Sequence, residues 1–108
     1  MVVLVTGANG QLGQAIKSIS RKYPEIDFVF CSSSDLDITN FENCQAVFST
    51  HQPHFCINTA AYTAVDKAES EPAKAFDINA NGAENLAITC KKFNTILIHI
   101  STDFVFDA

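Results

Sequence analysis

The sequence predicts an α/β fold in which a parallel sheet is covered by helices on both faces. Two observations carry this prediction. Four short runs rich in β-branched and aromatic residues recur along the chain, and a longer segment with polar turns or helical periodicity separates each run from the next. Because consecutive parallel strands need a crossover, which is usually helical, this alternation indicates a parallel sheet. The expected strand order is 3-2-1-4.

Each predicted strand is a short apolar run bounded by polar or turn-forming residues. The strands are Val2–Thr6, Asp27–Cys31, Phe55–Asn58 and Ile96–Ile100. The helix after the first strand ends near Tyr23, because a residue that precedes proline avoids the helical region. Residues at i, i+3, i+4 and i+7 form its expected buried face: Leu12, Ala15, Ile16 and Ile19.

Two further helices are predicted. Thr39 and Glu42 have the spacing of a capping box, which begins the second helix. Pro72 suits the first turn of a long third helix that extends to about Phe93, and Gly82 within it indicates close packing against a neighbour. The buried faces of these two helices are expected at Phe41, Cys44, Val47 and Phe48, and at Phe76, Ala80, Ala83, Leu86, Ala87 and Cys90.

Composition limits the classes of function. A chain of 108 residues forms one domain at most, and its net charge of −5, with no basic run longer than Lys91-Lys92, argues against binding to nucleic acid or to an anionic membrane. No segment reaches the length of a membrane span. Four cysteines occur singly and are expected to be buried thiols in a reducing cytoplasm, with a disulfide framework as the alternative: Cys31, Cys44, Cys56 and Cys90.

The glycine cluster between the first strand and the first helix indicates dinucleotide binding. Gly7 allows a tight turn out of the strand, Gly10 lets the backbone approach a pyrophosphate, and Gly13 lets the helix pack closely on the sheet. The N-terminus of the helix supplies N–H donors and the positive end of a dipole for the phosphates. A turn needed only for chain reversal is the alternative interpretation.

Three motifs extend this interpretation to a known family. The GxxGxxG spacing resembles that of the extended short-chain dehydrogenase/reductase superfamily. Residues 58–69 (NTAAYTAVDKAE) resemble the segment after the third strand of dTDP-4-dehydrorhamnose reductases, and residues 101–107 (STDFVFD) resemble their STDYVFDG motif. The resemblance follows the whole chain in order. It implies that residues 1–108 are the N-terminal portion of a Rossmann-type NAD(P)-binding domain.

The resemblance also implies an activity and a set of roles. Family members reduce dTDP-4-dehydro-6-deoxy-L-mannose, a dTDP-sugar, to dTDP-L-rhamnose with NADPH or NADH in the cytoplasm, and a homodimer is one implied assembly. Thr102 would hydrogen-bond the substrate carbonyl and Asp103 would touch the sugar, although a strand end followed by an Asx turn is the alternative for both. Cofactor contacts are placed at Gly7, Gly10, Gln11, Leu12, Gly13, Asp37, Ile38, Ala60, Ala61, Tyr62, Thr63 and Ile100.

The implied reaction needs a proton donor that these residues do not supply. In the superfamily a tyrosine protonates the substrate oxyanion, and a lysine four residues later lowers the pKa of that tyrosine. Tyr23 and Tyr62 are the tyrosines of this chain, and the fourth residue after each is Asp27 and Asp66. The YxxxK pair and the substrate domain are therefore expected beyond Ala108.

Three positions depart from the family pattern. Phe104 stands where the family has a tyrosine, which removes a hydroxyl near the substrate. Ala15 replaces a glutamate that some members use in metal-linked dimerisation, and the pair His51 and His54 has no third ligand nearby, so no metal is predicted. Ser32 stands where an acidic residue would bind the ribose 2′-hydroxyl. Without that carboxylate a 2′-phosphate is not repelled, so NADPH is favoured over NADH.

Two other interpretations stay open. A shortened Rossmann unit could act as a non-catalytic NADP-binding regulatory subunit, similar to the β subunit of methionine adenosyltransferase, or it could be a core fragment without a function of its own. A YxxxK pair in the reading frame beyond Ala108 would favour the enzyme, and a natural stop at Ala108 would favour the binding subunit. In the expected strand order the fourth strand has an open edge that carries Ile96, Ile98 and Ile100, so the isolated chain is expected to self-associate or to stay only partly folded.

Overall fold

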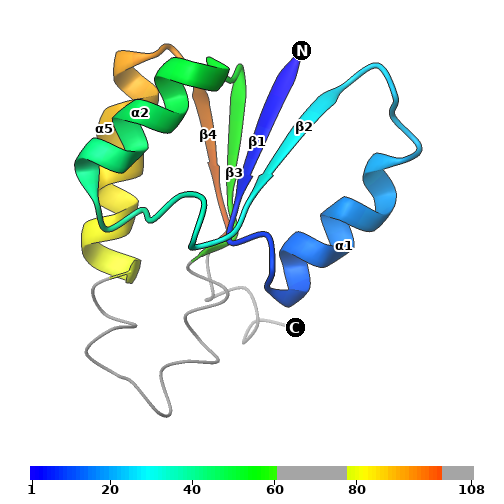
Figure 1. The fold of residues 1–108 in the computed structure, drawn as a ribbon, viewed down its shortest axis with the longest axis horizontal. Coiled ribbons are helices and arrows are strands. Elements are labelled where there is room, and N and C mark those ends of the chain that lie inside the picture. Colours follow the sequence, from blue (N-terminus) through cyan, green and yellow to red (C-terminus); the bar gives the residue numbers. More distant parts are fainter. Residues whose placement is uncertain (61–77, 101–108) are drawn as a thin grey trace.

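The computed structural model describes residues 1–60 and 78–100. Figure 1 shows four strands side by side, with one helix on one face of the sheet and two on the other, which confirms the predicted α/β fold. The beginning of the third predicted helix, with Pro72 and Phe76, lies outside the described residues. The elements are β1 (Val2–Thr6), α1 (Gln11–Ser20), β2 (Asp27–Cys31), α2 (Phe41–His51), β3 (Phe55–Asn58), the π-helical turn η1 (Ile78–Gly82), α5 (Ala83–Lys92) and β4 (Ile96–His99).

The strand order corrects the expected 3-2-1-4. All pairings are parallel, and the order is β2-β1-β3-β4, so β1 pairs with β2 on one side and with β3 on the other. Parallel crossovers are right-handed, which links the face that carries the helix to the direction in which the chain moves. Because α1 and α2 lie on opposite faces, the two crossovers run in opposite directions, and β3 therefore lies beyond β1 (Figure 1).

The main core lies between the sheet and the layer formed by α2 and α5. Leu4 of β1, Phe48 of α2 and Leu86 of α5 are all fully buried there, and the Phe48 ring contacts that of Phe93 with 6.0 Å between centroids. The expected burial of Phe48 and Leu86 is confirmed. The expectation is wrong at Ala80 in η1 and at Ala87 in α5, because both are exposed.

The start of α2 differs from the predicted capping box. Asn40 is the N-cap, and its Oδ1 accepts a hydrogen bond from the backbone N–H of Asn43 at 3.0 Å. Thr39 instead donates its hydroxyl to Asp37 Oδ1 at 2.6 Å. Phe41, expected to be buried, is 41% exposed because it occupies the first turn of the helix, away from the core.

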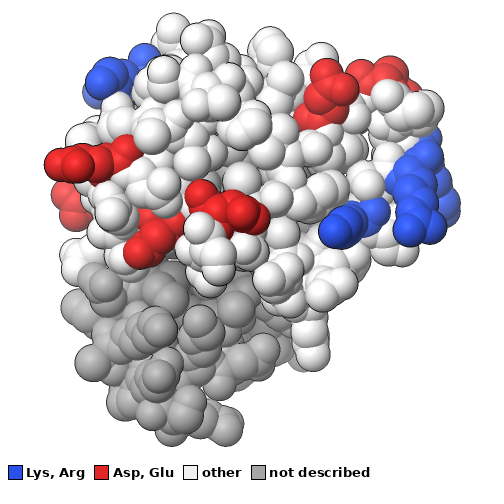
Figure 2. Space-filling view, in the orientation of Figure 1, with Lys and Arg blue, Asp and Glu red and all other residues white. Residues whose placement is uncertain are grey.

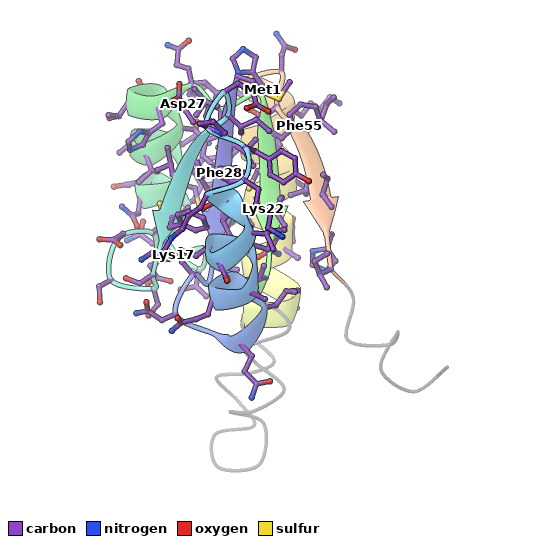
Figure 3. The ribbon with its side chains drawn as sticks, turned by 90° about the vertical axis from the view of Figure 1, so that its right-hand side faces the viewer. Met1, Lys17, Lys22, Asp27, Phe28 and Phe55 are labelled. Carbon is purple, nitrogen blue, oxygen red and sulfur yellow. The ribbon has the colours of Figure 1, made fainter. Side chains whose placement is uncertain are left out.

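Helix α1 covers its face of the sheet only in part. Gly13 is the buried residue of the helix, whereas Ala15 is exposed and Ile19 is 51% exposed, so the expected buried face is wrong at these two positions. Figure 3, which looks onto this face, shows α1 in front of β1 and β2. Ile96 and Ile98 of the edge strand β4 are also exposed. Among the described helices, none has the length and apolar character needed to cross a membrane.

The four cysteines are free, buried thiols, as predicted. Burial, and to a smaller extent the nearby carboxylates of Asp35 and Asp37 respectively, raise the pKa of Cys31 and of Cys44 from 9.0 to about 11. In the core the folded chain therefore holds these two thiol protons more tightly than the unfolded chain does.

Stability is expected to fall at high pH for this reason. A raised folded-state pKa gives a contribution that is fully present below about pH 9 and is lost as the pH rises to about 11, at up to about 1.4 kcal/mol per pH unit for each thiol. Urea unfolding of the native chain and of Cys44→Ala, at about pH 8 and about pH 10.5, measures the free energy of unfolding. The variant is expected to lose less stability between the two conditions. Equal losses would contradict the shifted pKa.

Candidate functional site

The carboxyl ends of the four strands meet at one edge of the sheet, the lower edge in Figure 1. At this edge β1 runs into the glycine turn, β2 runs into the segment that leads to α2, and β3 ends at Asn58. In open parallel sheets, ligands bind beyond the carboxyl ends of the strands where the strand order reverses direction. In this sheet that place is the end of β1, between β2 and β3.

Gly7 makes the turn out of β1. Its φ is +64°, in the left-handed region that side chains disfavour, and the turn is closed by a hydrogen bond from the Gly10 N–H to the Gly7 carbonyl at 3.0 Å. A Cβ at Gly7 would lie 2.9 Å from the backbone of Ala60 and from the Thr59 hydroxyl. The predicted tight turn is confirmed, and it lies directly against the segment that follows β3.

Gly13 and Gly10 have different structural reasons to be glycine. A Cβ on Gly13 would lie 2.6 Å from the Cα of Ala8, so a close approach does require glycine here, although the partner is the glycine turn and not the sheet as predicted. Gly10 is the N-cap of α1 with φ −76° and ψ 174°, an extended conformation that any residue can adopt. The backbone conformation of Gly10 therefore does not account for glycine at this position.

A hydrogen-bonded polar network joins the ends of β1, β3 and β4. The buried Thr6 donates its hydroxyl to Asn58 Oδ1 at 2.6 Å, and the same oxygen accepts the Ala60 N–H at 3.1 Å. Asn58 Nδ2 lies 3.1 Å from His99 Nδ1, where it donates if the imidazole proton is on Nε2. The Thr59 hydroxyl donates to the Thr6 carbonyl at 2.5 Å and lies 3.1 Å from the Gly7 carbonyl. This network fixes the position of the glycine turn relative to β3 and β4.

No role is predicted from the sequence for four members of this network: Thr6, Asn58, Thr59 and His99. The signal was present, because Thr6 and Asn58 end two of the predicted strands and His99 is a polar residue one position before the end of the fourth. Polar side chains at the carboxyl ends of parallel strands face the same edge of the sheet. Their pairing was not foreseen, because it depends on the strand order that the structure corrects.

The turn after β2 holds a carboxylate, Asp35, for which no role is predicted from the sequence. Asp35 Oδ2 accepts hydrogen bonds from the backbone N–H and from the hydroxyl of Ser32, both at 3.1 Å. Position 32 itself is a serine, so the carboxylate comes from three residues later in the same turn. The Ala8 N–H donates to the Cys31 carbonyl at 3.0 Å, which places this turn directly beside the glycine turn.

Asp37 and Ile38, the predicted cofactor contacts that follow this turn, differ in burial. Asp37 is exposed, and its Oδ1 accepts hydrogen bonds from both the N–H and the hydroxyl of Thr39. Ile38 is buried against α5, where a Cβ on Gly82 would lie 2.6 Å from its Cδ1. The close packing predicted for Gly82 is therefore confirmed, and Ile38 is its partner.

The structure brings most of the described candidate residues to one edge of the sheet. Gly7, Gly10, Gln11, Leu12 and Gly13 form the turn and the first turn of α1, and Ala60 lies against them. Ile100 follows β4 and donates its N–H to the Asn58 carbonyl at 3.3 Å. The remaining candidates lie outside the described residues: Ala61, Tyr62, Thr63, Thr102, Asp103 and, among the departures, Phe104.

Comparison with known proteins gives a consistent result. A family model described as "RmlD substrate binding domain" matches residues 1–108. The dTDP-4-dehydrorhamnose reductase of Aggregatibacter actinomycetemcomitans is 37% identical over 105 residues, which make up 97% of this chain and 36% of that protein.

Two solved structures are similar to the chain in both sequence and fold. The dTDP-4-dehydrorhamnose reductase of Clostridium acetobutylicum has a TM-score of 0.83 at 42% identity, covering 99% of this chain and 38% of that one. The Bacillus anthracis reductase, whose structure is in complex with NADP, has a TM-score of 0.81 at 42% identity, covering 97% of this chain and 37% of that one. The chain thus spans just over a third of the length of these relatives.

Proposed function

Because the chain belongs to the family described as the RmlD substrate binding domain, we propose that residues 1–108 supply the NAD(P)-binding part of a dTDP-4-dehydrorhamnose reductase. The whole enzyme would reduce dTDP-4-dehydro-6-deoxy-L-mannose to dTDP-L-rhamnose. The names of the relatives support this substrate, and the relative in complex with NADP supports a nicotinamide cofactor. The regulatory-subunit alternative gains no support from these relatives, which are named as reductases. The four free thiols support a reducing compartment such as the cytoplasm.

Gly10 carries the proposal. Its backbone conformation suits any residue, yet it is a glycine at the N-cap of α1, where a side chain would stand in front of the first N–H groups of the helix. These first N–H groups have no partner within a helix, and the helix dipole adds positive potential there. A pyrophosphate that approaches the backbone closely explains both the missing side chain at Gly10 and the lack, among the described residues, of a side chain that caps the helix. The N–H groups of Gln11, Leu12 and Gly13 would then bind it.

The remaining roles follow the direction of the bound dinucleotide. Asp37 and Ile38 would lie on the adenosine side, beyond β2. Ala60, Ala61, Tyr62, Thr63 and Ile100 would lie on the nicotinamide side, beyond β3 and β4. These residues would hold a nicotinamide cofactor, which when bound would supply the hydride for reduction of the substrate ketone. Thr102 would hydrogen-bond the carbonyl oxygen and Asp103 would contact the sugar.

The purified 108-residue chain is expected to bind NADPH and NADH without reducing dTDP-4-keto sugars. Neither Tyr23 nor Tyr62 has a lysine four residues later, and the loss of a positioned general acid alone costs about 100-fold or more in rate. Fluorescence titration measures cofactor binding, and the absorbance of NADPH measures turnover. A folded protein that binds neither cofactor would overturn the proposed function. Turnover at about one per second or faster would show that the chain holds a proton donor of its own.

A further inference from the structure

The side chain of Asp35 is fixed against the end of β2 by its own turn. Oδ2 accepts from the Ser32 N–H and hydroxyl, and the Asp35 N–H donates back to the Ser32 carbonyl at 3.0 Å. The turn is therefore closed by hydrogen bonds in both directions. Among the described residues, none donates to the second carboxylate oxygen, Oδ1, which leaves that oxygen available to accept a hydrogen bond.

This carboxylate lies on the side of the glycine turn where the adenosine would be bound. Thr6 and Cys31 are partners in the register of β1 and β2, and the Ala8 N–H donates to the Cys31 carbonyl. In dinucleotide-binding sheets the adenosine ribose lies beyond the second strand, and an acidic residue there accepts a hydrogen bond from the 2′-hydroxyl. Position 32 does not supply that carboxylate, whereas Asp35 brings one to the same turn.

We propose that Asp35 tunes the choice between cofactors with and without a 2′-phosphate: its carboxylate favours a ribose 2′-hydroxyl and disfavours a 2′-phosphate. The inference rests on the proposed cofactor site. Figure 2 supports it, because acidic side chains lie over the segment between β2 and α2 on this face, whereas the lysines and arginines lie mainly over α1.

The expected effect is moderate and dependent on salt. A phosphate monoester carries a charge of about −1.5 to −2 at neutral pH. Its repulsion by one carboxylate a few ångströms away, at the surface of a protein, amounts to about tenfold in affinity. Mobile ions screen charges at an exposed site, so the effect is expected to shrink as the salt concentration rises.

The test compares dissociation constants for NADPH and NADH by fluorescence titration, with the native protein, Asp35→Asn and Asp27→Asn. Asparagine can form the same turn but carries no charge. Asp27→Asn is the matched control, because this variant removes one carboxylate charge at the opposite end of β2 (Figure 3). Asp35→Asn is expected to shift the affinity ratio toward NADPH about tenfold at low salt and by less at high salt, and Asp27→Asn is expected to leave the ratio unchanged.

Each outcome decides a separate point. An unchanged ratio in Asp35→Asn, with cofactor still bound by the native protein, overturns the role of Asp35 and leaves the proposed function intact. A folded native protein that binds neither cofactor overturns both. Circular dichroism reports whether each variant is folded, and Asp35→Ser, which removes the charge with a different turn-forming side chain, provides the same comparison if Asp35→Asn does not fold.

Discussion

Replacing Gly10 by valine is expected to abolish nucleotide binding while the fold persists. The φ and ψ of Gly10, −76° and 174°, are accessible to valine, so the backbone has no reason to change. The new side chain would occupy the space in front of the first turn of α1, where the pyrophosphate is proposed to bind. The loss of two charge-assisted hydrogen bonds, each of about 1.5–3 kcal/mol, weakens binding by about 100-fold or more.

Calorimetric titration with NADPH measures this effect in the native protein, in Gly10→Val and in Ala46→Val. Ala46 is an exposed position on α2, which lies on the opposite face of the sheet from α1, and its variant controls for the added side chain. Thermal unfolding followed by circular dichroism reports whether each variant keeps the fold. Equal affinities of the native protein and Gly10→Val would mean that the glycines serve only to shape the turn.

Replacing Phe48 by alanine is expected to cost about 3–5 kcal/mol of the free energy of unfolding, the largest effect on stability of any single change considered. The ring is fully buried between α2 and the sheet and contacts Phe93, so its removal leaves a cavity that the surrounding strands and helices cannot easily fill. A domain of this size has a total stability of about 5–15 kcal/mol. The variant would therefore lose a large share of its folded population.

Phe41→Ala is the matched control, because Phe41 lies on the same helix and is 41% exposed. Urea unfolding is expected to show a loss of less than about 1 kcal/mol for this variant. Similar losses at the two positions would show that α2 does not pack through Phe48. That result would also remove the support for the core between α2, α5 and the sheet.

Patterns confined to one segment predicted the elements of the fold well. The bounds of β1, β2 and β3 agree with the predicted apolar runs, because each run is contiguous and ends at a polar or turn-forming residue. The strand order could not be obtained in this way. It depends on the face that α2 covers, and the residues of α2 specify that one side of the helix is apolar without specifying which face of the sheet receives it.

In the candidate site, too, the features within one segment were predictable and the contacts between distant segments were not. The glycine turn was predictable because Gly7, Gly10 and Gly13 are close in sequence and each acts through its own backbone. The contact between Thr6 and Asn58 joins residues 52 positions apart, and only the pairing of β1 with β3 brings them together. A role for Asp35 was not predicted, because a carboxylate was expected at position 32, directly after the strand. Asp35 lies three residues later, and the turn brings its side chain back to Ser32.

The order of the strands has a consequence for how the sheet assembles. β2 pairs with β1, β3 pairs with β1, and β4 pairs with β3, so every strand joins one that precedes it in the chain. During synthesis the chain emerges from the ribosome with its N-terminus first, and domains generally begin to fold in that direction. When a new strand leaves the ribosome, the strand with which it pairs has therefore already been synthesised. β1, which leads into the glycine turn, is the strand on which both β2 and β3 are added.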